Sequence, residues 1–283
     1  MFSTEDGGRP DSDRPPLKTL LIRPGAIGDC IVSLPALEHL RSEYTEIWVR
    51  FVNQPLLRFA DRVDSITATG LDLVGIQTPP RTMERLAEFD RIISWYGTNH
   101  AEFRAAVRGL PFTFHAPLPR DTGGHAVDFY AAQVGAAAGL TPRIPVGEVA
   151  RRNAIVIHPF SGSARKNWPL ARFRELAAAL PWPVEWTAGP EEPLEEATRF
   201  DDLYDLARWL AGARGYIGND SGISHLAAAV GVPVVALFRH DNAAVWSPRP
   251  SHVRLVNDET AISTLTPLFG PLFNPPGPGA KED

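Results

Sequence analysis

Asn219, Asp220, Ser221 and Gly222 form the segment of this chain where side chains able to do chemistry are most concentrated. They follow a short apolar run at 215–217 and precede small apolar residues, a pattern that predicts a strand, a tight polar turn and a helix. Small residues there let the backbone approach a ligand, and the helix presents free N–H groups and the positive end of its dipole. The turn therefore suits a phosphate or diphosphate. The alternative is that Asp220 or Ser221 only caps the helix.

A second polar loop, at 158–169, also follows a predicted strand. Ser161 offers a hydroxyl, Gly162 permits close backbone approach and Lys166 supplies positive charge. Such a loop suits a diphosphate. The alternative is a solvated basic turn in which Trp168 closes the edge of the sheet.

An acidic residue, Asp29, follows Gly28 at the end of the first predicted strand and the start of a helix. The turn at 23–28 lacks both the Gly-x-Gly-x-x-Gly spacing of a dinucleotide site and the lysine of a phosphate-binding loop. Asp29 either caps the helix or projects from the sheet edge and accepts a proton from a substrate hydroxyl. Its neighbour Cys30 has no adjacent base and is expected to pack in the interior.

Composition excludes several classes of protein. The 283 residues are 44% hydrophobic and carry a formal net charge of −5, which does not indicate nucleic-acid binding. The single cysteine excludes an intrachain disulfide, and no apolar run is long enough to predict a membrane span or a signal peptide. We expect a cytoplasmic protein with a disordered leader at 1–16 and a disordered tail at 274–283.

Strand and helix patterns alternate in both halves of the chain, which predicts an α/β protein with two parallel sheets. Thr141 to Arg152, rich in Pro, Gly and charge, is interpreted as a linker between domains at 17–145 and 146–273. Helices are also expected at 125–139 and 191–200. Because ligands of open α/β sheets bind at the carboxyl ends of the strands, the three segments above are expected to face one cleft.

Three motifs in this order resemble glycosyltransferase family 9, the ADP-heptose:lipopolysaccharide heptosyltransferases. They are Gly-Asp-x5-Pro-Ala-Leu at 28–37, His-Pro-Phe-Ser-Gly-Ser-Ala-Arg-Lys-Asn-Trp-Pro at 158–169 and Gly-Asn-Asp-Ser-Gly-Ile-Ser-His-Leu-Ala-Ala-Ala at 218–229. The resemblance spans residues 17–256 and implies a GT-B fold, two Rossmann-like domains around a cleft. It also implies metal-independent transfer with inversion, no cofactor, and a nucleotide-sugar donor, expected to be ADP-heptose. The implied acceptor is a lipopolysaccharide-core or related glycan, reached with at most peripheral contact to the inner membrane face.

The resemblance also implies roles for individual residues. Asp29 matches the proposed base, and Glu191 or Glu192 a contact to the donor ribose. The other residues matched to the donor site are Ser161, Gly162, Lys166, Asp220, Ser221, Gly222 and His225. For His225, a buried residue that orients the turn is the alternative. Arg23 and Arg50 could contact an anionic acceptor or simply be solvated.

Two other functions stay open: the same fold with another donor or a protein acceptor, and a non-catalytic nucleotide-sugar binder or GT-B epimerase. The presence of both Asp29 and Lys166 favours an enzyme. The chain departs from the family pattern at Phe160, where glycine is usual, and at 238–244, which replace a Gly-Pro-Thr run. The first departure is expected to reshape the phosphate loop, and the second leaves open which base or sugar the donor carries.

Overall fold

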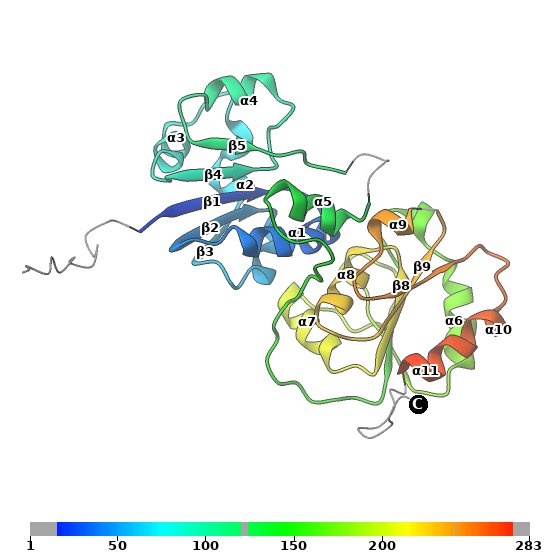
Figure 1. Ribbon diagram of the computed structural model, residues 1–283. Coiled ribbons are helices and arrows are strands. Elements are labelled where there is room, and N and C mark those ends of the chain that lie inside the picture. Colours follow the sequence, from blue (N-terminus) through cyan, green and yellow to red (C-terminus); the bar gives the residue numbers. More distant parts are fainter. Residues whose placement is uncertain (1–15, 120–123, 241, 274–283) are drawn as a thin grey trace, which may run out of the picture.

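Two parallel β-sheets of five strands each organise the chain in the computed structural model, which describes residues 16–119, 124–240 and 242–273 (Figure 1). The strand order is β3-β2-β1-β4-β5 in the first sheet and β10-β9-β8-β6-β7 in the second. The predicted α/β class with two parallel sheets is confirmed. The predicted boundary between residues 145 and 146 falls in a stretch without helix or strand, while the leader and tail predictions lie outside the described residues, apart from residue 16.

The first sheet comprises β1 (Lys18–Arg23), β2 (Tyr44–Val49), β3 (Arg62–Ser65), β4 (Arg91–Ser94) and β5 (Phe112–Phe114). Its helices are α1 (Ile27–His39), η1 (Phe51–Leu56), α2 (Ile66–Thr69), η2 (Leu71–Leu73), α3 (Pro80–Leu86), α4 (Ala101–Ala106) and α5 (Ala126–Gln133). The second sheet comprises β6 (Ile155–His158), β7 (Val184–Trp186), β8 (Gly215–Asn219), β9 (Val234–Phe238) and β10 (His252–Leu255). Its helices are η3 (Ala164–Lys166), α6 (Leu170–Ala179), α7 (Leu203–Ala211), α8 (Gly222–Ala229), α9 (Ala243–Trp246), α10 (Ile262–Leu265), η4 (Thr266–Leu268) and α11 (Phe269–Phe273).

The central strands are buried on both faces, as expected for parallel sheets covered by helices. All residues of β6, β8 and β9 are buried, and β1 is buried from its second residue onward. The chain that leaves β1 begins α1, and the chain that leaves β8 begins α8. The fold thereby places the three chemistry-bearing segments at the carboxyl edges of the two sheets.

The two lobes meet through helices rather than through loops alone. Helix α1 contacts both α5 and α8, and these three helices lie at the junction (Figure 1). One hydrophobic cluster includes Leu34 and Leu37 of α1, Leu206 and Leu210 of α7 and Ala227 of α8. A single apolar core therefore continues from the first lobe into the second.

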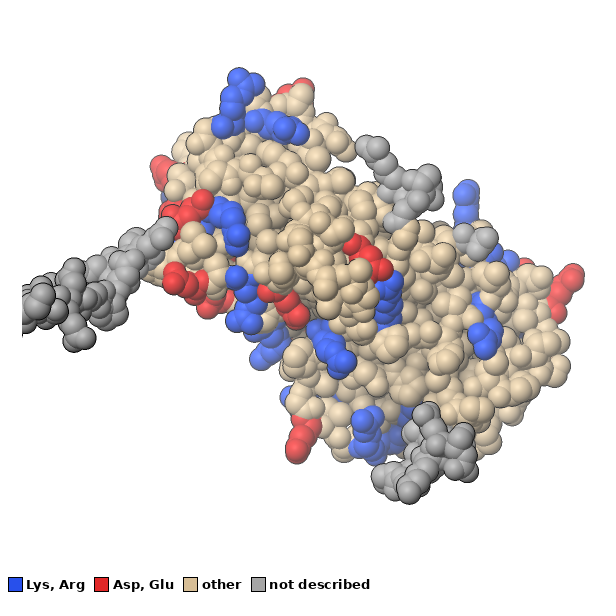
Figure 2. Space-filling view, viewed as in Figure 1, with Lys and Arg blue, Asp and Glu red and all other residues tan. Residues whose placement is uncertain are grey.

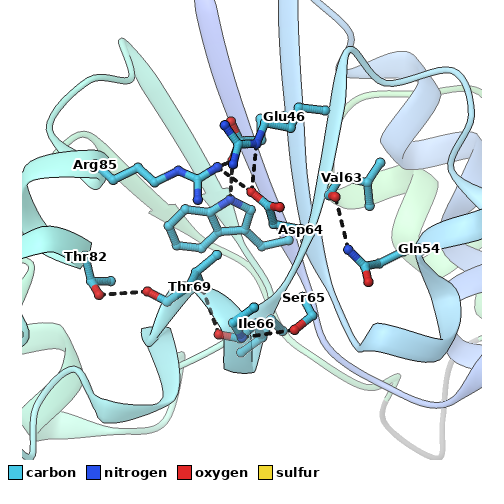
Figure 3. Close-up of polar contacts among 12 residues, drawn as sticks. Glu46, Gln54, Val63, Asp64, Ser65, Ile66, Thr69, Thr82 and Arg85 are labelled. Carbon is cyan, nitrogen blue, oxygen red and sulfur yellow. Dashed lines mark hydrogen bonds and ion pairs between the residues drawn. The ribbon is translucent and has the colours of Figure 1, made fainter.

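On the face of the first sheet opposite to α1, a cluster of ion pairs links α3 to the strands. Arg85 pairs with the carboxylates of Glu46 on β2 and Asp64 on β3 (Figure 3). Glu46 is 3% exposed and also accepts a hydrogen bond of 2.5 Å from the indole of Trp48. These residues line neither of the two cavities described below, so the cluster supports the lobe rather than the site.

Two predicted helices differ from the structure. α5 ends at Gln133 rather than continuing to Gly139, because Gly135, which follows the C-cap Val134, adopts a left-handed φ of 76°. Residues 191–200 form turns and an isolated bridge rather than a helix. There the Arg199 guanidinium donates to the carbonyls of Glu192 and Leu194, which fixes an irregular loop.

Basic and acidic side chains are interspersed on the face shown in Figure 2. None of the helices within the described ranges is long and apolar enough to cross a membrane.

Candidate functional site

Two adjoining cavities lie where the lobes meet, with volumes of about 440 Å³ and 280 Å³. Five residues line both: Ala26, Gly28, Gly162, Ser221 and Gly222. The first turn of α8 thus stands between a larger, mainly apolar cavity and a smaller one lined by charged and polar side chains, which we call the polar cavity. A ligand with two different ends could occupy both across this turn.

Asn219 fixes the geometry of that turn. Its side chain is fully buried, donates to the carbonyl of Pro159 at 2.8 Å and accepts from the N–H of Trp168 at 3.0 Å. These two bonds fasten the 158–169 loop to the end of β8. The two segments predicted to bind phosphate are therefore held side by side.

Ser221 and Asp220 have different roles in the turn. The Ser221 hydroxyl caps α8 by accepting from the N–H of Ser224, at 3.4 Å. Asp220 instead pairs with the Lys166 ammonium at 2.7 Å, and both line the polar cavity. The first-turn N–H groups of a helix have no intrahelical acceptor, so this end of α8 and Lys166 together form a positively polarised surface.

Asp29 lines the same polar cavity as Lys166. Its Oδ2 accepts from the N–H of Ala26 at 2.9 Å, whereas Oδ1 makes no hydrogen bond to any residue in the described ranges. The residue thus caps its helix through one oxygen and leaves the other free to accept a proton. Cys30 beside it is fully buried, and burial raises its pKa to about 12, which agrees with packing rather than nucleophilic chemistry.

Arg23 lies beneath this turn rather than on an acceptor-facing surface. Its side chain is only 2% exposed and donates to the carbonyls of Pro24 and Asp29, at 2.5 Å and 2.9 Å. The guanidinium also lies 4.5 Å from the centre of the Tyr130 ring. This geometry corrects the expectation of direct acceptor contact: Arg23 stabilises the backbone that carries Asp29.

The N-termini of α1 and α8 touch through glycines. A Cβ on Gly222 would lie 2.7 Å from Cβ of Ile27 and 3.0 Å from the backbone N of Gly28. A Cβ on Gly28 would lie 3.3 Å from Cδ2 of His225. The absence of side chains here sets how closely Asp29 approaches the turn of α8.

We expect Gly222→Ala to lower both stability and any activity of the site. The added methyl group has to displace α1 backbone, and such overpacking typically costs about 1–3 kcal/mol. Chemical unfolding measures the cost, and Gly109→Ala is the control because a Cβ there meets no atom within 4 Å. Equal stability of the two variants would show that the helices separate without strain.

His225 is buried against this contact and lines the polar cavity. Burial lowers its pKa to about 4. Asp220 and Asp29 favour the charged ring while His125 and Lys166 oppose it, but desolvation has the largest effect. The imidazole is therefore neutral at physiological pH, which leaves open both the orienting role and a donor contact.

Replacing His225 by glutamine should reduce the loss of stability in acid. An unfolded histidine has a pKa near 6.5, so the stability that neutral His225 provides is complete above that pH and is lost as pH falls toward 4. The loss amounts to roughly 1.4 kcal/mol per pH unit within that window. Urea unfolding as a function of pH measures it, with exposed His240→Gln as the control. If the free energy of unfolding of wild type and of His225→Gln changed in parallel between pH 6.5 and 4, the lowered pKa of His225 would be contradicted.

The larger cavity carries a carboxylate from the second lobe. Glu192 accepts from His158 Nε2 at 2.9 Å and from the N–H of Gly189 at 2.6 Å. Burial acts to raise the pKa of Glu192, but the hydrogen bonds from His158 and Gly189 and the nearby Arg199 guanidinium lower it overall, which favours the ionised carboxylate. Glu191 is exposed and lines neither cavity. Of the two acidic residues considered, Glu192 is the one at the site.

The remaining predicted residues are divided between the two cavities. Ser161 lines the larger cavity, and its hydroxyl lies within hydrogen-bond distance of two acceptors in its own loop, the Ser163 carbonyl at 2.8 Å and Asn167 Oδ1 at 2.7 Å. Arg50 is exposed and lines the same cavity from the first lobe. Sequence reasoning missed Thr187 and Trp246, which also line the cavities; Thr187 directly follows β7, the position where ligand contacts are expected.

Comparison with known proteins agrees with this geometry. A sequence model of glycosyltransferase family 9 (heptosyltransferase) matches residues 123–264, half of the chain. The chain belongs to glycosyltransferase family 9. This confirms the family resemblance and the enzyme class predicted from the three motifs.

Individual family 9 relatives show how far the similarity extends. Lipopolysaccharide heptosyltransferase 1 of Pseudomonas aeruginosa is 36% identical over 92 residues, which cover 27% of this chain and only 26% of that protein. Among solved structures, E. coli heptosyltransferase WaaC with ADP has a TM-score of 0.66 at 16% identity and is covered over 99% of its length, for 89% of this chain. The structure of E. coli ADP-heptose lps heptosyltransferase II has a TM-score of 0.69 at 17% identity, and the match covers 91% of this chain and 98% of that protein. These structures confirm the GT-B fold.

Proposed function

We propose that this family 9 enzyme transfers a heptose from ADP-heptose to a lipopolysaccharide-core or related glycan acceptor, with inversion at the anomeric carbon. The observation that carries the proposal is that Asp29 and Lys166, from opposite lobes, line one cavity beside the first turn of α8. The names of the relatives support the donor and acceptor classes.

The two cavities suggest how the donor lies. The larger cavity has apolar walls for a nucleobase, with Glu192 available to accept from ribose hydroxyls. The diphosphate then crosses Gly162, Ser221 and Gly222, the residues of the second lobe that line both cavities. This course delivers the sugar to the polar cavity, where Asp29 lies.

The reaction needs two groups from the chain. Negative charge grows on the departing diphosphate, and Lys166 together with the N–H groups of α8 stabilises that charge without protonating it. The acceptor hydroxyl meanwhile attacks the anomeric carbon and gives its proton to Asp29. A single displacement of this kind needs a base but no enzyme nucleophile. The other carboxylate of the polar cavity, Asp220, is paired with Lys166.

Direct binding and transfer test the proposal. Calorimetry with ADP-heptose and with UDP-, GDP- and CDP-sugars should show preference for the ADP-sugar, and only that donor should support transfer to a heptose-accepting glycan. Preference for another nucleotide would replace ADP-heptose as donor. Binding without turnover on any glycan or protein acceptor would favour a non-catalytic binder.

Metal independence stays a prediction of this mechanism. Among the described residues no group of three or more His, Cys, Asp or Glu side chains could hold a metal ion. We expect that a chelator leaves the initial rate of transfer within about twofold, because Lys166 and α8 already neutralise the leaving group. A rate that collapses with chelator and returns with one divalent cation would require a different mechanism.

An acceptor that is anionic and linked to a lipid would bear both on the arginines of the first lobe and on the location of the enzyme. Of the two arginines predicted to contact an anionic acceptor, Arg23 is buried, and Arg50 is exposed but lines the larger cavity, which the nucleotide occupies in this arrangement. A lipid-linked acceptor would bring the enzyme to the inner face of the membrane from the cytoplasm, as a peripheral contact. Co-sedimentation with acceptor-containing vesicles tests this location.

A further inference from the structure

The lining of the polar cavity includes an aromatic residue, Trp246. It is the last residue of α9 and lines the cavity together with Asp29, Lys166 and His225. Within the described ranges, it supplies the one large apolar side chain of that lining. A diphosphate binds to cations and N–H donors, so a large apolar side chain beside it indicates that a further, less polar part of the ligand binds here.

Hydrogen bonds fasten the segment after Trp246 to α5. His125 begins that helix, and its Nε2 donates to the carbonyl of Ser247 at 2.8 Å while Nδ1 accepts from the N–H of Val127 at 3.2 Å. This pattern requires the neutral ring, and burial lowers the pKa of His125 accordingly. The residue after Trp246 is thus tied to the first turn of α5.

An ion pair adds a second fastening. Arg249 donates to both carboxylate oxygens of Asp128, at 2.9 Å and 2.7 Å, and Asp128 also accepts from the N–H of Gly139. Paired bonds of this kind fix orientation as well as distance. Because α5 packs on α1, which carries Asp29, these contacts set where Trp246 lies relative to Asp29. We call His125, Asp128, Ser247 and Arg249 the α5 clasp.

We propose that Trp246 is a specificity-determining residue, the platform on which the transferred sugar packs, and that the α5 clasp positions it. The inference rests on the proposed function, which brings the sugar into the polar cavity. A pyranose ring presents C–H groups on its faces and hydroxyls at its rim. An indole offers a large, rigid apolar face, while Asp29 and Lys166 supply partners for the rim. The segment 238–244, where this chain departs from its family, leads directly into this platform.

The platform predicts a selective loss of affinity. Trp246→Ala should weaken ADP-heptose binding by about tenfold while leaving ADP within about twofold, because ADP does not reach the ring. Trp246→Phe should recover most of the loss. Calorimetry of both ligands gives the affinity ratio of ADP-heptose to ADP for each variant, and the ADP value itself reports that the fold is intact.

The outcomes separate this inference from the function on which it rests. A wild-type protein that binds ADP but gains nothing from the sugar, or a ratio unchanged in Trp246→Ala, overturns the platform alone. Failure of the wild type to bind either ligand overturns the proposed function and the platform with it.

The clasp has its own test. Asp128→Asn removes the ion pair without touching the cavity, and it should lower the same affinity ratio at unchanged ADP affinity. Glu196→Gln is the matched control, since it breaks the Arg174–Glu196 pair at 3.0 Å on the protein surface. An Asp128→Asn variant that only loses thermal stability, with its ratio intact, would reduce the clasp to a structural contact.

Discussion

Asp29→Asn should lower kcat for sugar transfer by about 10²–10⁴-fold, the range typical of a lost general base. Asparagine retains the oxygen that accepts from Ala26, so the helix cap and the turn persist. The amide cannot take up the acceptor proton. Donor affinity should stay within about twofold, because the nucleotide is held by the second lobe.

Comparison of variants at this position isolates the base. Asp29→Ala removes the cap as well and should cost about 1 kcal/mol of stability in addition to the activity. Glu38→Gln changes another carboxylate of the same helix, exposed and outside both cavities, and should be neutral. Single-turnover transfer and calorimetry with ADP give the two quantities. Turnover of Asp29→Asn near the wild-type rate would remove Asp29 as the base.

Lys166→Met should weaken ADP-heptose binding and lower kcat, the latter on the order of 10²-fold. Methionine preserves the length of the side chain but not its charge. The loss has two sources. The diphosphate loses its cation, and the Asp220 carboxylate, now unpaired, repels it.

A double variant separates these two sources. Asp220→Asn in the Lys166→Met background should restore part of the donor affinity, since it removes the repulsion without replacing the cation. Arg165→Met is the matched control: it lies one residue away, is exposed and lines neither cavity. If Arg165→Met weakens donor binding as much as Lys166→Met, general positive charge in the loop matters rather than this ammonium.

The features that were predictable from the sequence are local ones. Lys166 and the turn at 219–222 follow two strands that end at the same edge of the second sheet, and Asp29 follows β1 of the first sheet. Each segment thus lies at a carboxyl edge, where ligands of parallel sheets bind. The parallel sheets follow from short apolar runs that alternate with helical patterns. The role of Asn219 as the tie between two loops needed the structure, because its two partners lie 51 and 60 residues away in the chain.

Tertiary contacts account for what sequence reasoning missed. Glu191 and Glu192 are equivalent in the sequence, and only the bonds from His158 and Gly189 select Glu192. An arginine is usually a surface residue, so the sequence suggested a ligand contact for Arg23. In the structure its guanidinium instead packs on the Tyr130 ring and donates to two backbone carbonyls. The expected helix at 191–200 failed for the same reason, since Arg199 satisfies carbonyls that a helix would otherwise pair.

The apolar core shared by α1, α7 and α8 bears on protein engineering. Chimeric enzymes are an obvious route to new donor and acceptor combinations when two lobes bind the two substrates. If lobes from two enzymes were joined at the linker, α1 from one parent would have to pack against α7 and α8 from the other, and these side chains would not fit together. A viable hybrid would have to carry these helices as one grafted unit, so the recombination points lie inside each lobe rather than between them.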